Sequence, residues 1–180
     1  MGGVIYIKNT LAWKTKPNRV TWFIWALAPL TWASATWYSQ GFVWSAVPVF
    51  MAGLIPLLIL LSSFVNKKSY WKLGKLDYFC FIFALWALVL WGVTDNALLA
   101  IIFAVLADFL AAIPLLIKMY KFPETETIWP FFAGLFANFT ASLVIENWIL
   151  EEYLFPLYLV MICILLIGAY YWKKIFYTKN

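Results

Sequence analysis

The lysine and arginine residues of this chain occur in alternate gaps between its apolar segments, a pattern typical of proteins that cross a membrane several times. All 13 of them lie in four places: 8–19, 67–75, 118–121 and the tail at 173–179. The other gaps contain no basic residue; Asp95 lies in one, and Glu146, Glu151 and Glu152 lie in another. Because cytoplasmic loops collect Lys and Arg, we expect the basic gaps and the C-terminus on the cytoplasmic side.

The composition agrees with a membrane protein and excludes several soluble classes. The chain is 66% hydrophobic and 12% charged, whereas soluble domains contain about 25% charged residues. The net charge of +5 is explained by the basic loops, so we expect membrane lipid as a partner and no nucleic acid. The chain contains no histidine and no motif of a hydrolase, nucleotide-binding protein or metalloprotease. We therefore expect no enzyme, no cofactor and no metal site, and we interpret Cys80 and Cys163 as packing residues.

The apolar segments predict an all-α fold, a polytopic bundle of transmembrane helices forming a single domain over 1–180. A helix needs about 20 apolar residues to cross the hydrocarbon of a bilayer. Six segments qualify, one of them short: 20–38, 42–64, 78–93, 97–119, 127–145 and 153–172. Residues 2–7 are apolar but cover only about a third of a bilayer. They resemble the cytoplasmic end of a first helix that is truncated. We expect an integral protein of a prokaryotic cell membrane.

Two stretches of the chain share an order of features and predict an internal repeat. In 5–23 and in 114–129, a helix closed by Lys is followed by a turn around Pro, polar residues and a Trp that opens the next helix. Pro suits a helix N-terminus, and Asn18 beside the first turn is suited to cap. Two further spans follow each copy, and one linking span lies between the two sets of three. Because an odd number of spans separates the copies, both have the same orientation. The alternative is that any basic loop before a Pro-started helix produces this pattern.

The predicted plan is therefore two parallel three-helix repeats joined by a linking helix, a 3+1+3 arrangement. The first repeat is 1–64 and incomplete, the linking helix is 78–93, and the second repeat is 97–172. This plan, and the helix end Ala111-Ala-Ile-Pro114-Leu-Leu-Ile-Lys118 before a Pro–polar turn, resemble the PQ-loop superfamily, which includes the SWEET and SemiSWEET sugar transporters. The resemblance covers most of the chain and is specific around 107–129 and 6–25.

The chain departs from that family in ways that affect the expected substrate. The signature Pro–Gln pair is Pro114-Leu115 here, and Val4 stands where the first copy would have Pro. The Asn residues that line sugar sites on the third helix of each SWEET repeat have no counterpart in 42–64 or 153–172. The superfamily also includes amino-acid, vitamin-precursor and sorting-receptor members. Sugar specificity therefore does not carry over, and the resemblance implies a fold better than a substrate.

Asp108 is the ionisable residue nearest the middle of a span. Placing a carboxylate there costs about 2.5–3.5 kcal/mol on insertion scales, so such residues usually have a function. Ala104, Ala111 and Ala112 lie on the same helical face, which indicates a close helix contact or a cavity. We interpret Asp108 as a proton-coupling carboxylate or a ligand for a polar substrate. The alternative is a structural hydrogen bond between helices.

Three further residues complete the predicted substrate site, and two prolines are predicted hinges. Asn138 and Ser142 share a face of their helix with Gly134, which indicates either a cavity wall or tight packing. Trp25 lies on a stripe with Trp22 and Trp32 and could stack on a planar ligand, although aromatic packing or lipid contact is the favoured interpretation. Pro114 and Pro29 lie inside spans, where kinks can serve alternating access.

The most specific functional reading is a membrane transporter of a small polar metabolite, a sugar or a similar molecule, that works by alternating access, either passively or linked to a proton. The alternative is a non-transporting scaffold, sorting receptor or accessory subunit. A homo-oligomer is a further expectation, since a second protomer could supply contacts that the short first segment does not make.

Overall fold

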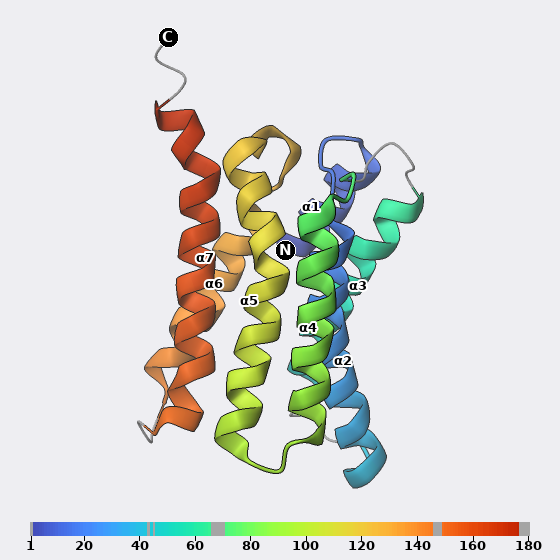
Figure 1. Cartoon of the computed structure of the whole chain (residues 1–180), viewed down its shortest axis with the longest axis vertical. Coiled ribbons are helices and arrows are strands. Elements are labelled where there is room, and N and C mark those ends of the chain that lie inside the picture. Colours follow the sequence, from blue (N-terminus) through green and yellow to red (C-terminus); the bar gives the residue numbers. More distant parts are fainter. Residues whose placement is uncertain (1, 43, 45, 66–70, 146–148, 177–180) are drawn as a thin grey trace.

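The computed structural model describes residues 2–42, 44, 46–65, 71–145 and 149–176, and its regular structure in these ranges is entirely helical (Figure 1). In chain order the elements are α1 (Gly2–Leu11), α2 (Arg19–Gln40), α3 (Ala46–Val65), α4 (Lys75–Val93), α5 (Ala97–Lys121), the 3-10 turn η1 (Pro123–Thr125), α6 (Trp129–Leu143) and α7 (Leu150–Phe176). The all-α prediction is confirmed for the described part of the chain.

Four helices are long and apolar enough to cross a membrane: Ala46–Val65, Lys75–Val93, Leu98–Lys121 and Tyr153–Trp172. Their outer faces fit that interpretation, because Phe79, Ile82 and Trp86 of α4 are each more than half exposed. The other two predicted spans also form helices. These are α2, with 22 residues, and α6, with 15. The prediction of an integral membrane protein is therefore supported by four helices, while α6 is shorter than the roughly 20 residues of a full span.

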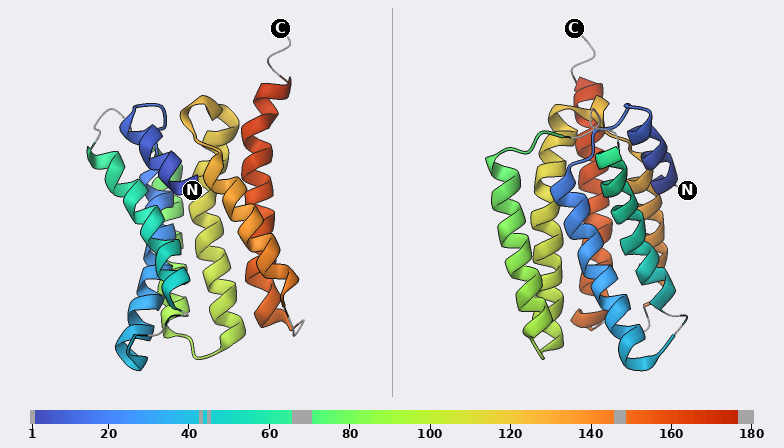
Figure 2. Two further views of the ribbon diagram at one scale, coloured as in Figure 1. Left: turned by 180° about the vertical axis from the view of Figure 1, so that it is seen from behind. Right: turned by 90° about the vertical axis from the view of Figure 1, so that its right-hand side faces the viewer.

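The contacts among α1, α2 and α3 follow the same order as those among α5, α6 and α7, and these two groups are called the helix sets below. α3 packs against both α1 and α2, and α7 packs against both α5 and α6. Within the described residues, the backbones of α1 and α2 do not approach each other closely, and neither do those of α5 and α6. The side chains of Tyr6 on α1 and Trp22 on α2 do meet. The third helix of each set therefore lies between the first and the second. α4 packs mainly against α5, with a smaller contact to α2 (Figure 2).

The described parts of the basic gaps lie at one end of the molecule, called the basic end below. The α1–α2 connection, the η1 turn and the C-terminal end of α7 lie at the top of Figure 1, together with the N-terminal end of α4. The α2–α3 and α4–α5 connections lie at the opposite end, where Asp95 is found. Basic and non-basic connections therefore alternate between the two ends, as expected of a chain that crosses a membrane several times. The cytoplasmic placement of the basic end remains a prediction.

Small residues allow the helices to approach closely, as is usual in membrane bundles. A Cβ atom at Gly53 of α3 would lie 3.0 Å from the carbonyl oxygen of Ala26 on α2. Ala111 of α5 is fully buried and packs with Ile24 and Ala84, on the helices α2 and α4. The close helix contact expected near Asp108 is thus present.

Candidate functional site

A cavity of about 430 Å³ lies between the two helix sets. Its wall is built from α1, α2, α3, α5, α6 and α7, and its volume is in the range of small-molecule sites. Most of the wall is apolar. Among the described residues that line it, the side chains with polar atoms are Trp22, Trp25, Asp108, Asn138 and Cys163.

The structure brings four of the six predicted site and hinge residues to this cavity. Trp25, Pro29, Asp108 and Asn138 all line it. Ser142 does not; its hydroxyl is buried and donates to the carbonyl oxygen of Asn138 at 2.8 Å. Pro114 also lies elsewhere, in a smaller cleft at the basic end. The roles assigned to these residues from the sequence remain predictions.

Asp108 has a hydrogen-bond partner on another helix. The hydroxyl of Tyr158, on α7, donates to Oδ2 of Asp108 at 2.7 Å. Asp108 also borders a second void of about 70 Å³, and it shares both walls with Trp25, Pro29 and Phe155. Asp108 and Trp25 therefore stand between two spaces that a ligand or water could fill. Sequence reasoning missed Tyr158, whose only signal is a hydroxyl inside an apolar span.

Trp25 has a buried polar atom without a partner. Its indole N–H is buried and makes no hydrogen bond within the described part of the chain. The Trp25 ring meets Trp22 edge-on at 5.4 Å and Phe131 at 6.4 Å between ring centroids. An unpaired buried donor costs about 1–3 kcal/mol, so it marks a place where a ligand could contribute an acceptor. Trp32, on the same predicted stripe, is 42% exposed and lies outside this group.

Asn138 presents an acceptor on the α6 side of the cavity. Its Nδ2 donates to the carbonyl oxygen of Gly134 at 2.8 Å, one turn earlier on the same helix. Oδ1 accepts no hydrogen bond from the residues that the structure describes. Gly134 is also at the wall, where a Cβ atom would lie 3.3 Å from Sγ of Cys163. The predicted small, polar face of this helix therefore reaches the cavity through Gly134 and Asn138.

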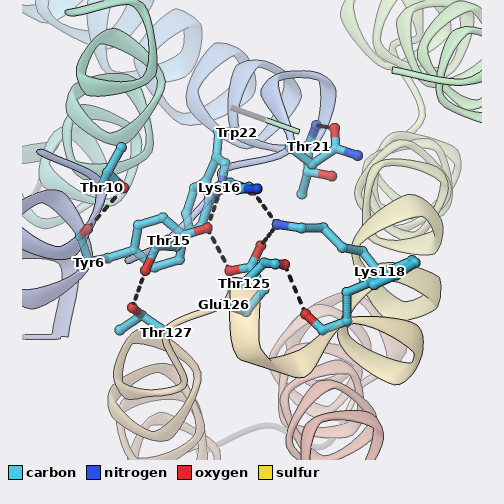
Figure 3. A network of polar contacts seen from close by, with 12 residues as sticks. Tyr6, Thr10, Thr15, Lys16, Thr21, Trp22, Lys118, Thr125, Glu126 and Thr127 are labelled. Atoms are coloured by element: carbon cyan, nitrogen blue, oxygen red, sulfur yellow. Dashed lines mark hydrogen bonds and ion pairs between the residues drawn. The ribbon is translucent and has the colours of Figure 1, made fainter. Parts of the chain in front are cut away.

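A buried network of polar groups, called the basic-end network below, lies between the cavity and the basic end. Figure 3 shows its centre at Glu126, whose Oε2 accepts a hydrogen bond of 2.6 Å from the Tyr6 hydroxyl. Oε1 of Glu126 pairs with Nζ of Lys118, which also donates to the backbone carbonyl of Lys16. The Lys118 and Glu126 side chains are 1% and 0% exposed. Trp22 joins this network to the cavity, because its N–H donates to the Tyr6 hydroxyl at 3.3 Å.

Further hydrogen bonds tie the two connections at this end together. The hydroxyls of Thr15 and Thr127 share a hydrogen bond of 2.6 Å, and Nδ2 of Asn9 donates to Thr127 at 2.9 Å. The amide of Lys16 donates to the carbonyl oxygen of Thr125 at 2.9 Å. The loop before α2 and the loop before α6 are therefore held against each other. These are the loops that carry the predicted repeat.

Sequence reasoning placed Glu126 in a basic loop without recognising this burial. The only signal was a lysine and a glutamate eight residues apart across a Pro turn. A second buried acid, Asp77, was also missed. Its Oδ1 accepts from Nδ2 of Asn18 at 2.5 Å, and its Oδ2 accepts from the amide of Gly74 at 2.6 Å.

The acidic and thiol side chains of the chain are also possible metal ligands. The described residues contain no group of three or more Cys, Asp or Glu side chains placed to hold a metal ion. Glu146 and the side chains of Glu151 and Glu152, which the sequence placed together in one gap, lie outside the described residues. Comparison of the chain with protein-family models, with curated proteins and with solved structures finds no match. The PQ-loop resemblance therefore stays a prediction.

Proposed function

We propose that this chain is a membrane transporter that moves a small polar metabolite by alternating access, on a plan similar to that of PQ-loop and SWEET-like proteins. The observation that carries the proposal is the cavity between the two helix sets, with Trp25, Asp108 and Asn138 in its wall. An intramembrane carboxyl beside a cavity is a common feature of transport pathways.

The arrangement of helices supports two parallel repeats. Each set has its third helix between the first and the second, and the sets meet through α1 against α6 and α2 against α5. A two-fold axis that exchanges α1 with α5 and α2 with α6 would turn one of these contacts into the other. Parallel repeats of this kind are related by an axis along the membrane normal, and substrate sites lie at their interface.

The basic-end network supplies a gate for the proposed cycle. None of Tyr6, Lys118 and Glu126 lines the cavity, whereas Trp22 belongs to both the cavity and the network. Opening the path toward the basic end would require the loops before α2 and α6 to separate and these bonds to break. Pro29 and Pro114 lie within α2 and α5, the helices through which the sets meet, so both are suitably placed for rocking.

One observation favours the non-transporting alternative. Asp108 is held by Tyr158 across a helix contact, as expected of a structural hydrogen bond in a scaffold or receptor. The two functions differ in whether water reaches the cavity. A transporter must admit water and substrate to Asp108 and Asn138 from at least one side during its cycle.

Thiol labelling tests the proposal directly. Asp108→Cys and Asn138→Cys are made separately in a chain with Cys80 and Cys163 replaced by Ala, and each is treated with a membrane-impermeant thiol reagent from either side. We expect both positions to react from at least one side. Phe139→Cys is the matched control, because its side chain is 52% exposed on the outer surface of α6 and should face lipid. Absence of labelling at both cavity positions from both sides would favour the scaffold or receptor.

A further inference from the structure

We propose that the cavity binds a small organic amine that also carries an oxygen acceptor. Its ammonium group would pair with Asp108, its apolar body would lie against Trp22, Trp25 and Phe131, and its oxygen would accept from the Trp25 N–H. The proposal rests on the proposed transport function and names the class of its substrate.

The charge of the cavity wall selects a cation. Asp108 is the one charged side chain among the described residues that line the cavity, and no Lys or Arg is among them. Lys118 lies ten residues further along α5, about 15 Å by the helical rise, and its charge is paired with Glu126. Tyr158 gives Asp108 a neutral hydrogen bond only. An ammonium ligand would therefore supply the counter-charge that the wall lacks, whereas an anion would meet only like charge.

The shape and chemistry of the wall select an apolar body. The Trp22, Trp25 and Phe131 rings form one aromatic group, with centroids 5.4–6.4 Å apart, and all three line the cavity. Aromatic faces attract organic cations and accommodate planar groups. A polyhydroxy ligand fits less well, because each buried hydroxyl needs a partner. The lining side chains offer few beyond Asp108, Asn138 and the Trp25 N–H.

The unpaired Trp25 N–H selects the second polar feature of the ligand. The indole of Trp22 donates to Tyr6, but that of Trp25 donates to nothing in the described residues. Trp25 and Asp108 line the same two voids, so we place the ammonium group and the oxygen of the ligand on neighbouring atoms of one short chain.

Four probes of similar size test these three features by calorimetry on the full chain in neutral phosphatidylcholine nanodiscs. Phenylethanolamine carries the ammonium group, the hydroxyl and the ring. Phenylethylene glycol replaces the ammonium group by a hydroxyl, mandelate replaces the whole aminomethyl group by a carboxylate, and phenethylamine lacks the hydroxyl. We expect phenylethanolamine to bind about tenfold or more tightly than the glycol or mandelate, and more tightly than phenethylamine.

Variants assign the binding to the proposed atoms. Asp108→Asn should weaken phenylethanolamine binding by about tenfold or more without affecting the glycol, and Asp108→Glu should recover part of the loss. Trp25→Phe should abolish the preference for phenylethanolamine over phenethylamine. Asp95→Asn, at the far end of the molecule, is the matched control and should change nothing. Equal binding of glycol and amine by the unaltered chain, or preference for mandelate, would overturn the proposal without any variant.

Flux into liposomes separates this proposal from the proposed function. Binding of the amine with the expected selectivity, but without flux, would retain the ligand class and contradict transport. Flux of a neutral metabolite, with no selective binding of the amine, would retain transport and contradict the ligand class.

Discussion

At the scale of the residue, Asp108 shows how a polar group is accommodated between membrane helices. Its carboxyl receives the Tyr158 hydroxyl at 2.7 Å. In lipid there is little water to replace a lost partner, although measured hydrogen bonds between membrane helices stabilise by only about 1–2 kcal/mol. Asp108 also lines two voids, so the same group that joins α5 to α7 is available to a ligand.

Tyr158→Phe removes that hydrogen bond without changing the ring. We expect it to lower the free energy of unfolding by about 1–2 kcal/mol, because the carboxyl loses its donor. The apparent melting temperature in detergent should fall by roughly 2–4 °C per kcal/mol. Tyr171→Phe is the control, because Tyr171 is 38% exposed near the end of the same helix. Equal melting temperatures for the two variants would show that the Asp108–Tyr158 bond contributes no stability.

The sequence identified the polar residues that are unusual in an apolar segment but missed Tyr158 and Glu126. Asp108 and Asn138 stand out because polar side chains within spans are rare. Tyr158 is 50 residues from Asp108 in the chain, and no local pattern pairs residues on different helices. Glu126 lies in a polar connection where an exposed acid is ordinary, so its burial against Lys118 gave no sequence signal.

At the scale of the element, two helices begin with an Asn cap in very different surroundings. Oδ1 of Asn18 accepts from the amides of Val20 and Thr21 at the start of α2, and its Nδ2 donates to buried Asp77 at the start of α4. Asn96 caps α5 by accepting from the amide of Leu99 and lies at the surface. Asn18 therefore joins the first turns of two helices, whereas Asn96 stabilises one.

Asn18→Ala should destabilise the protein more than Asn96→Ala does. Loss of an Asn cap costs about 0.5–2 kcal/mol, and the Asn18 variant also leaves Oδ1 of Asp77 without its donor, which costs about 1–3 kcal/mol more. Asn96→Ala should lose only the stability that the helix cap contributes. Thermal unfolding of both variants in the same detergent measures the difference. Equal losses would mean that the bond between Asn18 and Asp77 adds nothing.

The existence of the helices could be predicted from the sequence better than their ends. The predicted span 20–38 corresponds to the helix α2, Arg19–Gln40, and the predicted span 127–145 corresponds to α6, Trp129–Leu143. Hydrophobicity marks where a chain can be buried, whereas hydrogen bonds and caps decide where a helix stops. For α6, Pro130 lies within the first turn and Ile128 provides no side-chain cap, while after Leu143 the amide of Val144 donates to the carbonyl oxygen of Ala141.

At the scale of the whole molecule, the described basic gaps, which alternate along the sequence, lie together at one end of the bundle. The order of helices within each set could not be predicted, because it depends on contacts between segments that are distant in the chain. Trp13, beside Lys14 in the loop before α2, is 61% exposed, and Val93 at the opposite end is 71% exposed. These two positions report the orientation of the bundle.

Trp13→Cys and Val93→Cys, each in a background without Cys80 and Cys163, should label from opposite sides. If cytoplasmic loops collect the basic residues, an impermeant reagent added to intact cells should modify only Val93→Cys. Trp13→Cys should react after permeabilisation. The reverse result would invert the predicted orientation, and labelling of both positions in intact cells would contradict the single basic side.

The basic-end network gives the last prediction, because it should govern both stability and access to the cavity. Lys118→Met leaves the Glu126 charge buried and unpaired, which should cost about 3–5 kcal/mol. Lys118→Met combined with Glu126→Met removes both charges, so much of this stability should return.

The double variant lacks the ion pair that holds the loops before α2 and α6 together. In an Asn138→Cys background without Cys80 and Cys163, it should therefore label faster from the basic end. Lys121→Met with Glu124→Met is the matched control, since both side chains are exposed in the same region. If stability returns in the double variant but labelling stays at the rate of its parent, the network holds the fold together without acting as a gate.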